Sequence, residues 1–227
     1  MQLFKVRDFG DLLQDTFKFL GENWKSLFKV AVLYAGPFFL LQGIMNGIYQ
    51  SKIKAITEDF QENVATSSDP MGQMMDFYAS IFNFEYFLVV IFSILASAVM
   101  MAVTYNYVIK YEENNLQTPD DDQVRPAAFA SVPKFIGYAI VVSLLVAVGF
   151  VFFVIPGIYL FVPLSFLFMI ALRENLGLGE AFSRCFKLIK DHWWMTFGLL
   201  IIIYFIYAFA SFLFQVPQML FLSLIHI

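Results

Sequence analysis

The sequence predicts an all-α integral membrane protein, a polytopic helical bundle with amphipathic helices at the membrane surface. Of its 227 residues, 60% are hydrophobic and 14% are charged. Soluble domains average about 45–50% apolar and about 25% charged residues. Several apolar stretches also reach the length of about 20 residues that crosses a bilayer. We therefore treat residues 1–227 as a single membrane domain.

The apolar stretches predict five full spans and a partial sixth. The spans are expected at about residues 27–49, 84–109, 135–154, 158–172 and 194–214, with the partial span at 219–227. Polar loops are expected at 50–83 and 110–134. Ile155-Pro156-Gly157 and Gln215-Val216-Pro217-Gln218 are expected to turn the chain.

The first predicted element is a surface helix at about residues 9–20. Its apolar side chains recur at helical spacing, which places them on one face; they are Phe9, Leu12, Leu13, Thr16, Phe17 and Leu20. The segment is too short and too polar to cross a bilayer, so we expect it to lie in the plane of the interface. Trp24 follows at the level of the lipid headgroups.

The first span carries a few features that bear on function. Lys29 lies near its start, where it can extend toward the headgroups. Gly36-Pro37 predicts a kink. Gln42 and Asn46 lie one turn apart and either line a polar pore or ligand site, or form hydrogen bonds between helices.

Two loop motifs resemble metal sites. Met71, Met74 and Met75 suggest either a soft-metal site or the packing face of an additional surface helix near residues 77–82. Asp120-Asp121-Asp122 lacks the alternating ligands, central glycine and distal glutamate of a calcium-binding EF-hand loop. We interpret these aspartates as part of a solvated loop.

The second and fourth spans each carry a feature that bears on packing or function. Ser93, Ser97, Ala98 and Ala102 predict close helix contact along the second span. Pro163 interrupts the fourth span and marks either the broken helix of a transporter site or a structural kink.

A second surface helix is predicted at about residues 178–190. Its apolar face repeats the spacing of the first; the members are Leu178, Ala181, Phe182, Cys185, Phe186 and Ile189. Cys185 is the only cysteine and is expected to fill space in that face rather than to act as a reactive thiol. The opposite face carries Arg184, Lys187 and Lys190, which either contact anionic lipid headgroups or reflect only the charge bias of cytoplasmic segments.

The two surface helices predict an internal repeat. They match at an offset of 169 residues, which aligns Phe17 with Phe186 and Trp24 with Trp193. Residues 124–134 are a degenerate middle copy in this interpretation. The interpretation predicts three parallel repeats, each made of a surface helix and a membrane hairpin.

The basic residues predict the orientation. With the N-terminus in the cytoplasm, 12 of the 14 Lys and Arg residues lie on the cytoplasmic side, and the exceptions are Lys52 and Lys54. This is the positive-inside bias of an inner-membrane protein. Residues 1–25 do not resemble a cleaved signal peptide, so the first span is expected to insert uncleaved.

No motif for catalysis, cofactor binding or metal binding stands out in the sequence. Ionisable residues are missing from the middle of the predicted spans, which argues against a proton pump. The net charge of −4 argues against a nucleic-acid partner. The expected partners are membrane lipids and a protein at the cytoplasmic face.

Residues 150–200 resemble the glycerophosphoryl diester phosphodiesterase membrane-domain family of bacteria and related uncharacterised integral membrane families. The matching features are Pro156-Gly157, Pro163, Glu174-Asn175, Glu180-Ala181 and Trp193-Trp194. The resemblance implies a helical membrane fold, and it transfers no catalytic residue. In that family the membrane region sometimes precedes a phosphodiesterase domain. The tail Leu222–Ile227 resembles translated sequencing-adapter sequence, so we expect the native part of this sequence to end near Phe221.

Three functions follow as hypotheses. The first is a non-enzymatic membrane protein with a structural role or a role in contacting lipids or partners. The second is the membrane anchor of a phosphodiesterase whose catalytic domain is missing from this sequence. The third is a transporter of a neutral or lipidic substrate that uses the break at Pro163 together with Gln42 and Asn46.

Overall fold

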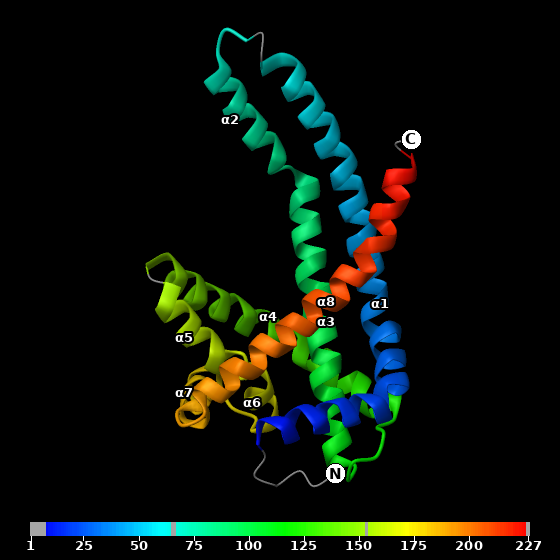
Figure 1. The fold of residues 1–227 in the computed structure, drawn as a ribbon, viewed down its shortest axis with the longest axis vertical. Coiled ribbons are helices and arrows are strands. Elements are labelled where there is room, and N and C mark those ends of the chain that lie inside the picture. The colour runs from blue at the N-terminus through cyan, green and yellow to red at the C-terminus, as the bar shows by residue number, and fades with distance from the viewer. Residues whose placement is uncertain (1–7, 65–66, 153, 226–227) are drawn as a thin grey trace. The chain divides into compact units, whose positions relative to one another are not determined.

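The computed structural model describes residues 8–64, 67–152 and 154–225, and within these residues every regular element is an α-helix. Figure 1 shows the helices in chain order. They are α1 (Phe9–Val64), α2 (Pro70–Ile81), α3 (Phe84–Glu113), α4 (Asp121–Phe152), α5 (Val154–Leu164), α6 (Leu167–Arg173), α7 (Leu178–Ile189) and α8 (Trp193–Ile225). The predicted all-α class is confirmed.

Five helical segments of the described chain are long and apolar enough to cross a membrane. They are α1, α3, α4 through Val151, the stretch Val154–Arg173 that contains α5 and α6, and α8 through Leu213. The length and apolarity of these segments identify a membrane-embedded protein, as the composition predicts. The exact number of spans and the internal repeat stay predictions.

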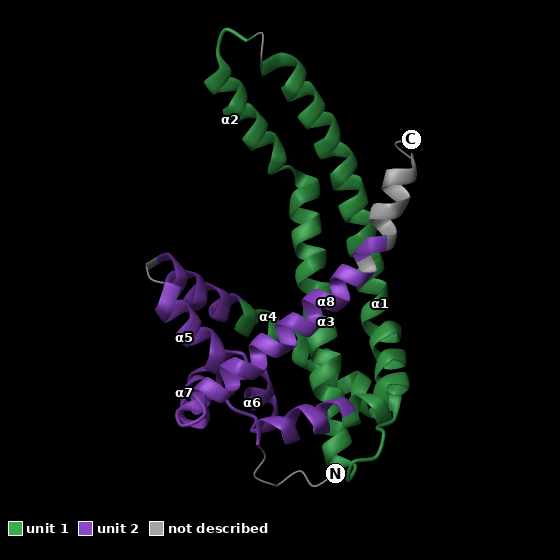
Figure 2. Ribbon diagram, in the orientation of Figure 1, with its two compact units in different colours: residues 1, 18–139 green, residues 2–17, 140–227 purple. Residues whose placement is uncertain are grey.

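The chain divides into two compact units (Figure 2). One unit contains residues 18–139, and the other contains residues 2–17 together with residues 140–227. The first unit therefore holds most of α1, all of α2 and α3 and the start of α4. The second unit holds the rest of α4 and helices α5 to α8.

Several small side chains are buried in the first unit. Ala31 and Ala35 of α1 are buried, as are Ala98 and Ala102 of α3. Small residues let membrane helices approach closely, so the expectation for Ala98 and Ala102 is met. Ser97, in contrast, is exposed.

Buried amides tie the helices of this unit together. Asn23 of α1 is 3% exposed and accepts hydrogen bonds from the hydroxyls of Tyr107 and Thr118, both at 3.4 Å. Asn106 of α3 donates to Oγ of Ser131 in α4 at 2.9 Å. Buried polar groups that satisfy one another hold the helices in register without leaving an uncompensated group in an apolar interior.

The first helix is longer than predicted. The expected surface helix at 9–20, the first span and the beginning of the expected loop at 50–83 form one continuous helix of 56 residues. Residues 50–64 contain neither Gly nor Pro, and Lys54 and Glu58 form an i,i+4 ion pair at 3.8 Å. These features favour a helix over residues 50–64 although the segment is polar. The lack of apolar periodicity predicts a loop there instead.

The rest of the expected 50–83 loop is also helical. Asp69 caps α2 by accepting the amide of Gly72 at 3.0 Å. Phe77 of α2 stacks on Phe60 of α1 with ring centroids 4.5 Å apart, which forms a helical hairpin. Met71 and Met75 are each 69% exposed, so they do not pack as expected.

The expected loop at 110–134 is shorter than predicted because α4 begins at Asp121. Carboxylates are favourable in a first helical turn, where they face the positive end of the helix dipole. Asp121 also accepts a 2.7 Å hydrogen bond from Lys29 of α1. Further along α4, Val124, Ala128 and Phe135 recur on one buried face.

The helical hairpin of α4 and α5 turns at a different place than predicted. Pro156 and Gly157 lie inside α5 rather than in a turn. Proline is tolerated in the first turn of a helix because its missing amide has no partner there. The expected break near Pro163 is confirmed, because α5 ends at Leu164 and α6 begins at Leu167.

The last helix also continues beyond its predicted end. α8 runs without interruption from Trp193 to Ile225, through the turn expected at 215–218. Transmembrane helices tolerate an internal proline because local adjustments satisfy the freed backbone groups. The separate sixth segment expected from Met219 is part of α8.

Candidate functional site

The second amphipathic helix, α7, provides the candidate site. It packs on α5 and α6. Ala181 and Cys185 are completely buried and Ile189 is 5% exposed, so the apolar face lies against protein. The basic residues of the predicted site therefore point away from the packed face, and the helix bounds agree with the prediction to within one residue.

The connection from α6 fixes where α7 begins. Asn175 has a left-handed backbone (φ 50°), which asparagine tolerates better than most residues. The amide of Leu176 then bonds to the carbonyl of Ala171 at 3.1 Å. Glu180 accepts the amide of Gly177 at 3.1 Å, which satisfies a free donor at the helix start.

The thiol of Cys185 lies inside the α7 packing face. Burial raises its pKa to about 11 from an ordinary value of 9.0. A thiol that stays protonated at neutral pH is a poor nucleophile. This environment favours the space-filling interpretation of Cys185.

The three predicted basic residues are not equivalent. Nε of Arg184 lies 3.1 and 3.0 Å from the two carboxylate oxygens of Glu174, so its charge is compensated inside the unit. Within the described residues, no carboxylate lies within ion-pair distance of Lys187 or Lys190. These two lysines are the basic groups of α7 that are available to a ligand.

Both available lysines line a groove beside Trp193. The lining of a cavity of about 310 Å³ contains both lysines together with Tyr159, Pro163, Phe186, Ile189 and Trp193. A second cavity of about 570 Å³ shares Tyr159, Lys190 and Trp193 with the first. We call the two together the Trp193 groove.

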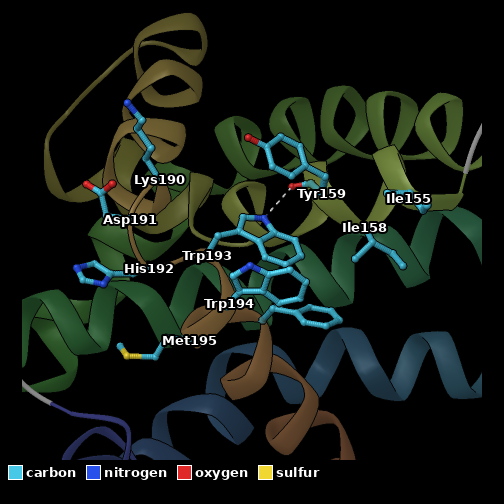
Figure 3. A pocket seen from close by; sticks show the side chains of 10 residues that line it. Ile155, Ile158, Tyr159, Lys190, Asp191, His192, Trp193, Trp194 and Met195 are labelled. Atoms are coloured by element: carbon cyan, nitrogen blue, oxygen red, sulfur yellow. Dashed lines mark hydrogen bonds between the residues drawn. The ribbon is translucent and has the colours of Figure 1, made fainter.

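The Trp193 groove has a polar end and an apolar end (Figure 3). Lys190, Asp191 and His192 lie on one side of the indole rings, and Ile155 and Ile158 lie on the other. These three polar residues come from the short turn between α7 and α8, whereas Lys187 lies in α7. The isoleucines come from the first turns of α5.

Stacked aromatic rings form the middle of the groove. Trp193 stacks with Tyr159 at 5.9 Å and with Phe197 at 5.2 Å, and Trp194 meets it edge-on at 4.8 Å. The indole Nε1 of Trp193 also donates to the Tyr159 carbonyl at 3.4 Å. Aromatic pairs of this kind add to the stability of the packing between α5 and α8.

Beyond Phe197 the surface becomes entirely apolar. Phe197 also lines a third cavity of about 470 Å³, together with Phe161, Leu200, Ile201, Ile203, Tyr204 and Tyr207. This cavity lies along α5 and α8, both of which belong to candidate membrane spans. A cationic and carboxylate-bearing end is thus continuous with a long apolar track, the arrangement that suits an amphiphile.

The other candidates from the sequence are not assembled into a site. Gln42 donates to Oγ of Ser93 at 3.3 Å, which favours the helix–helix interpretation. Asn46 is exposed. Of the three aspartates at 120–122, Asp121 is paired with Lys29. No cluster of three or more His, Cys, Asp or Glu that could hold a metal occurs among the residues that the structure describes.

The break at Pro163 is closed by local hydrogen bonds. The amide of Ser165 bonds to the Phe161 carbonyl at 3.0 Å, and the amide of Phe166 bonds to the Pro163 carbonyl at 3.2 Å. Oγ of Ser165 bonds to the Val162 carbonyl at 2.7 Å. Because these groups satisfy one another, the break is better suited to shaping the helix than to binding a substrate.

Sequence reasoning missed part of the groove. Tyr159, Asp191 and His192 line it, and none was predicted as a site residue. Asp191 and His192 could have been found from their position between a basic helix and paired tryptophans. Tyr159 joins the groove only through the packing of α5, for which the local sequence gives no signal.

The chain matches no family model, no curated protein and no solved structure.

Proposed function

We propose that this chain is a non-enzymatic inner-membrane protein that holds a phospholipid at its cytoplasmic surface. Lys187 and Lys190 contact the lipid phosphate, and the apolar end of the Trp193 groove receives the adjoining glycerol and acyl chain. The observation that carries the proposal is the continuity between two available lysines, a stacked aromatic cluster and an apolar track. This interpretation refines the prediction that Arg184, Lys187 and Lys190 contact anionic lipid.

The charges support a phosphate as the bound group. A Lys or Arg near the membrane surface contributes about 1 kcal/mol to attraction for anionic headgroups. Lys187 and Lys190 can each contribute in this way because no ion pair holds them within the described residues. Arg184 contributes less, since its guanidinium is held by Glu174 at 3.0 Å.

The aromatic cluster supports a position at the membrane surface. Tryptophan prefers the headgroup level, where its ring is apolar and its N–H can bond. Trp193 and Trp194 begin α8, a candidate span, directly after the polar turn at Asp191-His192. On the N-inside arrangement this end of α8 lies on the cytoplasmic side, as do α7 and its lysines.

The apolar track along α5 and α8 positions the acyl chain but does not select one lipid over another. Bilayer tails are as apolar as leucine, so moving an acyl chain from the bilayer into an apolar groove gains little free energy. Selectivity for one lipid over another must therefore come from the polar end of the groove. The effect of substituting the lysines tests this directly.

The test compares a double substitution in the groove with a matched one outside it. Lys187→Gln with Lys190→Gln removes two charges that line the groove, and Lys18→Gln with Lys25→Gln removes two on the same predicted side of the membrane. We call Lys187→Gln with Lys190→Gln the groove variant. Two contributions of about 1 kcal/mol predict that it binds phospholipids roughly 30-fold more weakly, whereas the other double variant keeps its affinity. Native mass spectrometry of the detergent-solubilised protein measures bound lipid.

The control variant is expected to bind phospholipid like the unaltered protein. Equal lipid binding by the groove variant and the unaltered protein would falsify the proposal. Melting temperatures of both variants show whether a loss of binding reflects a loss of fold. Because both lysines are exposed, we expect changes in stability of no more than about 0.5 kcal/mol.

A further inference from the structure

The polar end of the Trp193 groove carries a carboxylate beside its lysines. Asp191 follows Lys190 directly, and both residues line the same cavity. Within the described residues, Asp191 forms no ion pair with Lys190 or with any other basic group. The rim therefore presents free charges of both signs (Figure 3).

We infer that the groove selects an aminophospholipid, a lipid whose headgroup carries both a phosphate and a primary ammonium. This inference rests on the proposed function and adds the class of headgroup. The phosphate lies between the ammonium groups of Lys187 and Lys190, and the headgroup amine donates hydrogen bonds to the carboxylate of Asp191. The phosphoethanolamine headgroup has this chemistry.

Charge complementarity separates this headgroup from purely anionic ones. A headgroup with a phosphate and no amine satisfies the lysines but leaves the Asp191 carboxylate beside negative charge. Like charges in one site repel each other, whereas an ammonium at this position neutralises the carboxylate and forms charge-assisted hydrogen bonds. The carboxylate thus disfavours the anionic headgroup as well as favouring the zwitterionic one.

Hydrogen bonding separates a primary from a quaternary ammonium. A choline headgroup has no N–H to donate, and proteins bind it through open faces of aromatic rings. Trp193 already stacks with Tyr159 and Phe197. Trp194 also lines the groove and is 79% exposed, so an aromatic ring is open to a choline there. Among the charged residues of the rim, the Asp191 carboxylate is the group that accepts hydrogen bonds from a primary amine, and the comparison with phosphatidylcholine decides between the two.

The test measures binding of three lipids with identical acyl chains: phosphatidylethanolamine, phosphatidylglycerol and phosphatidylcholine. The full-length protein is titrated with each in detergent, and bound lipid is counted by native mass spectrometry. We expect the unaltered protein to prefer phosphatidylethanolamine. Asp191→Asn should weaken phosphatidylethanolamine binding by about fivefold, the effect of one charge pair near the surface, and should leave phosphatidylglycerol binding unchanged or stronger.

Asp122→Asn is the matched control because its side chain is 93% exposed and lies outside the groove. It should bind all three lipids like the unaltered protein. Equal affinity for phosphatidylethanolamine and phosphatidylglycerol in the unaltered protein, or an Asp191→Asn variant with unchanged selectivity, would overturn the inference. Equal binding of phosphatidylcholine and phosphatidylethanolamine would overturn it too, because the amine hydrogens would then have no role.

The double lysine variant distinguishes this inference from the proposed function. If Lys187→Gln with Lys190→Gln abolishes phospholipid binding while Asp191→Asn changes no preference, the phosphate site stands and the amine site falls. If the lysine variant binds every lipid normally, both fall. Asp191 is exposed at the end of α7, so its substitution is expected to leave the fold intact.

Discussion

At the scale of single residues, α7 separates its chemistry by face. Cys185 is fully buried where the helix meets α5 and α6, and Lys187 is exposed two positions later. Arg184 lies one position before the cysteine and is held by Glu174. The sequence places three basic residues at helical spacing on one face of α7. Only Lys187 and Lys190 are available to a ligand, because Arg184 is paired with Glu174.

The buried thiol leads to a prediction about labelling. In the folded protein at pH 8, Cys185 is expected to react with a soluble maleimide at least ten times more slowly than an exposed cysteine. Burial blocks access, and a pKa of about 11 keeps the thiol protonated at this pH. The rate of labelling in mild detergent, followed by mass spectrometry, measures the difference.

The control for this measurement is Ser183→Cys in a Cys185→Ala background. Ser183 is exposed on the same helix, so its cysteine should label rapidly. Denaturation in sodium dodecyl sulfate should make Cys185 equally reactive. Rapid labelling of Cys185 before denaturation would contradict the packed position of α7.

At the scale of elements, the α4–α5 hairpin depends on two glycines. A Cβ added at Gly149 would lie 3.0 Å from Cα of Gly157. A Cβ added at Gly157 would lie 2.8 Å from the ring of Phe150. At Gly149 the backbones of the two helices leave little room for a side chain, and at Gly157 the Phe150 ring occupies the space. Small residues allow such tight helix contact in membranes.

This contact predicts opposite effects for two Gly→Ala substitutions in the same helix. Gly149→Ala should destabilise the protein by about 1–3 kcal/mol because α4 and α5 must move apart. Gly137→Ala should be neutral or stabilise by up to about 1 kcal/mol, since nothing lies within 4 Å of its added Cβ and alanine favours a helix. Thermal unfolding in detergent, monitored by tryptophan fluorescence, compares the two.

Equal stability of the two variants would argue against the close approach of the helices. The same experiment with Gly157→Ala checks the other side of the contact. Its added Cβ meets a phenylalanine ring, which can rotate, whereas that of Gly149 meets backbone. We therefore expect Gly157→Ala to be the milder change.

At the scale of the whole molecule, the apolar runs were sufficient to predict the fold class and several elements. α3 and α7 begin at their predicted residues because an apolar run or a periodic apolar face starts sharply at each. Residues 50–64 were predicted as a loop, because a polar helix without an apolar face leaves no periodic signal. The turn expected at Pro156-Gly157 lies in the first turns of α5, where proline is compatible with a helix.

The candidate site was predicted in part for the same reason. Lys187 and Lys190 follow from the alternation of apolar and basic positions along one helix. The pairing of Arg184 with Glu174 crosses a chain reversal, and Tyr159 reaches the groove from α5. Both depend on how helices pack, which one-dimensional periodicity does not encode.

Two ion pairs join α1 to other helices of the first unit at two different heights along α1. Lys29 pairs with Asp121, and Lys52 pairs with Glu85, at 2.7 and 2.8 Å. Lys29 and Lys52 are 23 residues apart in α1, which is about 35 Å along a helix. The apolar core of a bilayer is about 30 Å thick. The spacing therefore predicts one membrane crossing between the two charged pairs.

This spacing yields a prediction about orientation. Met71 of α2 lies beyond the Lys52 pair and is 69% exposed, whereas Asp122 lies beside the Lys29 pair. With the N-terminus in the cytoplasm, Met71→Cys should react with a membrane-impermeant maleimide in right-side-out vesicles, and Asp122→Cys should react only in inside-out vesicles. Both variants carry Cys185→Ala, and that background alone is the unlabelled control.

The labelling pattern also tests whether the two pairs lie on opposite sides of the membrane. Reaction of both cysteines in the same vesicles would contradict a membrane crossing between Lys29 and Lys52. Reaction with the sides exchanged would keep the crossing and reverse the orientation. That result would place Lys187 and Lys190 against the outer leaflet, because an even number of predicted spans separates them from Lys29 and keeps them on its side.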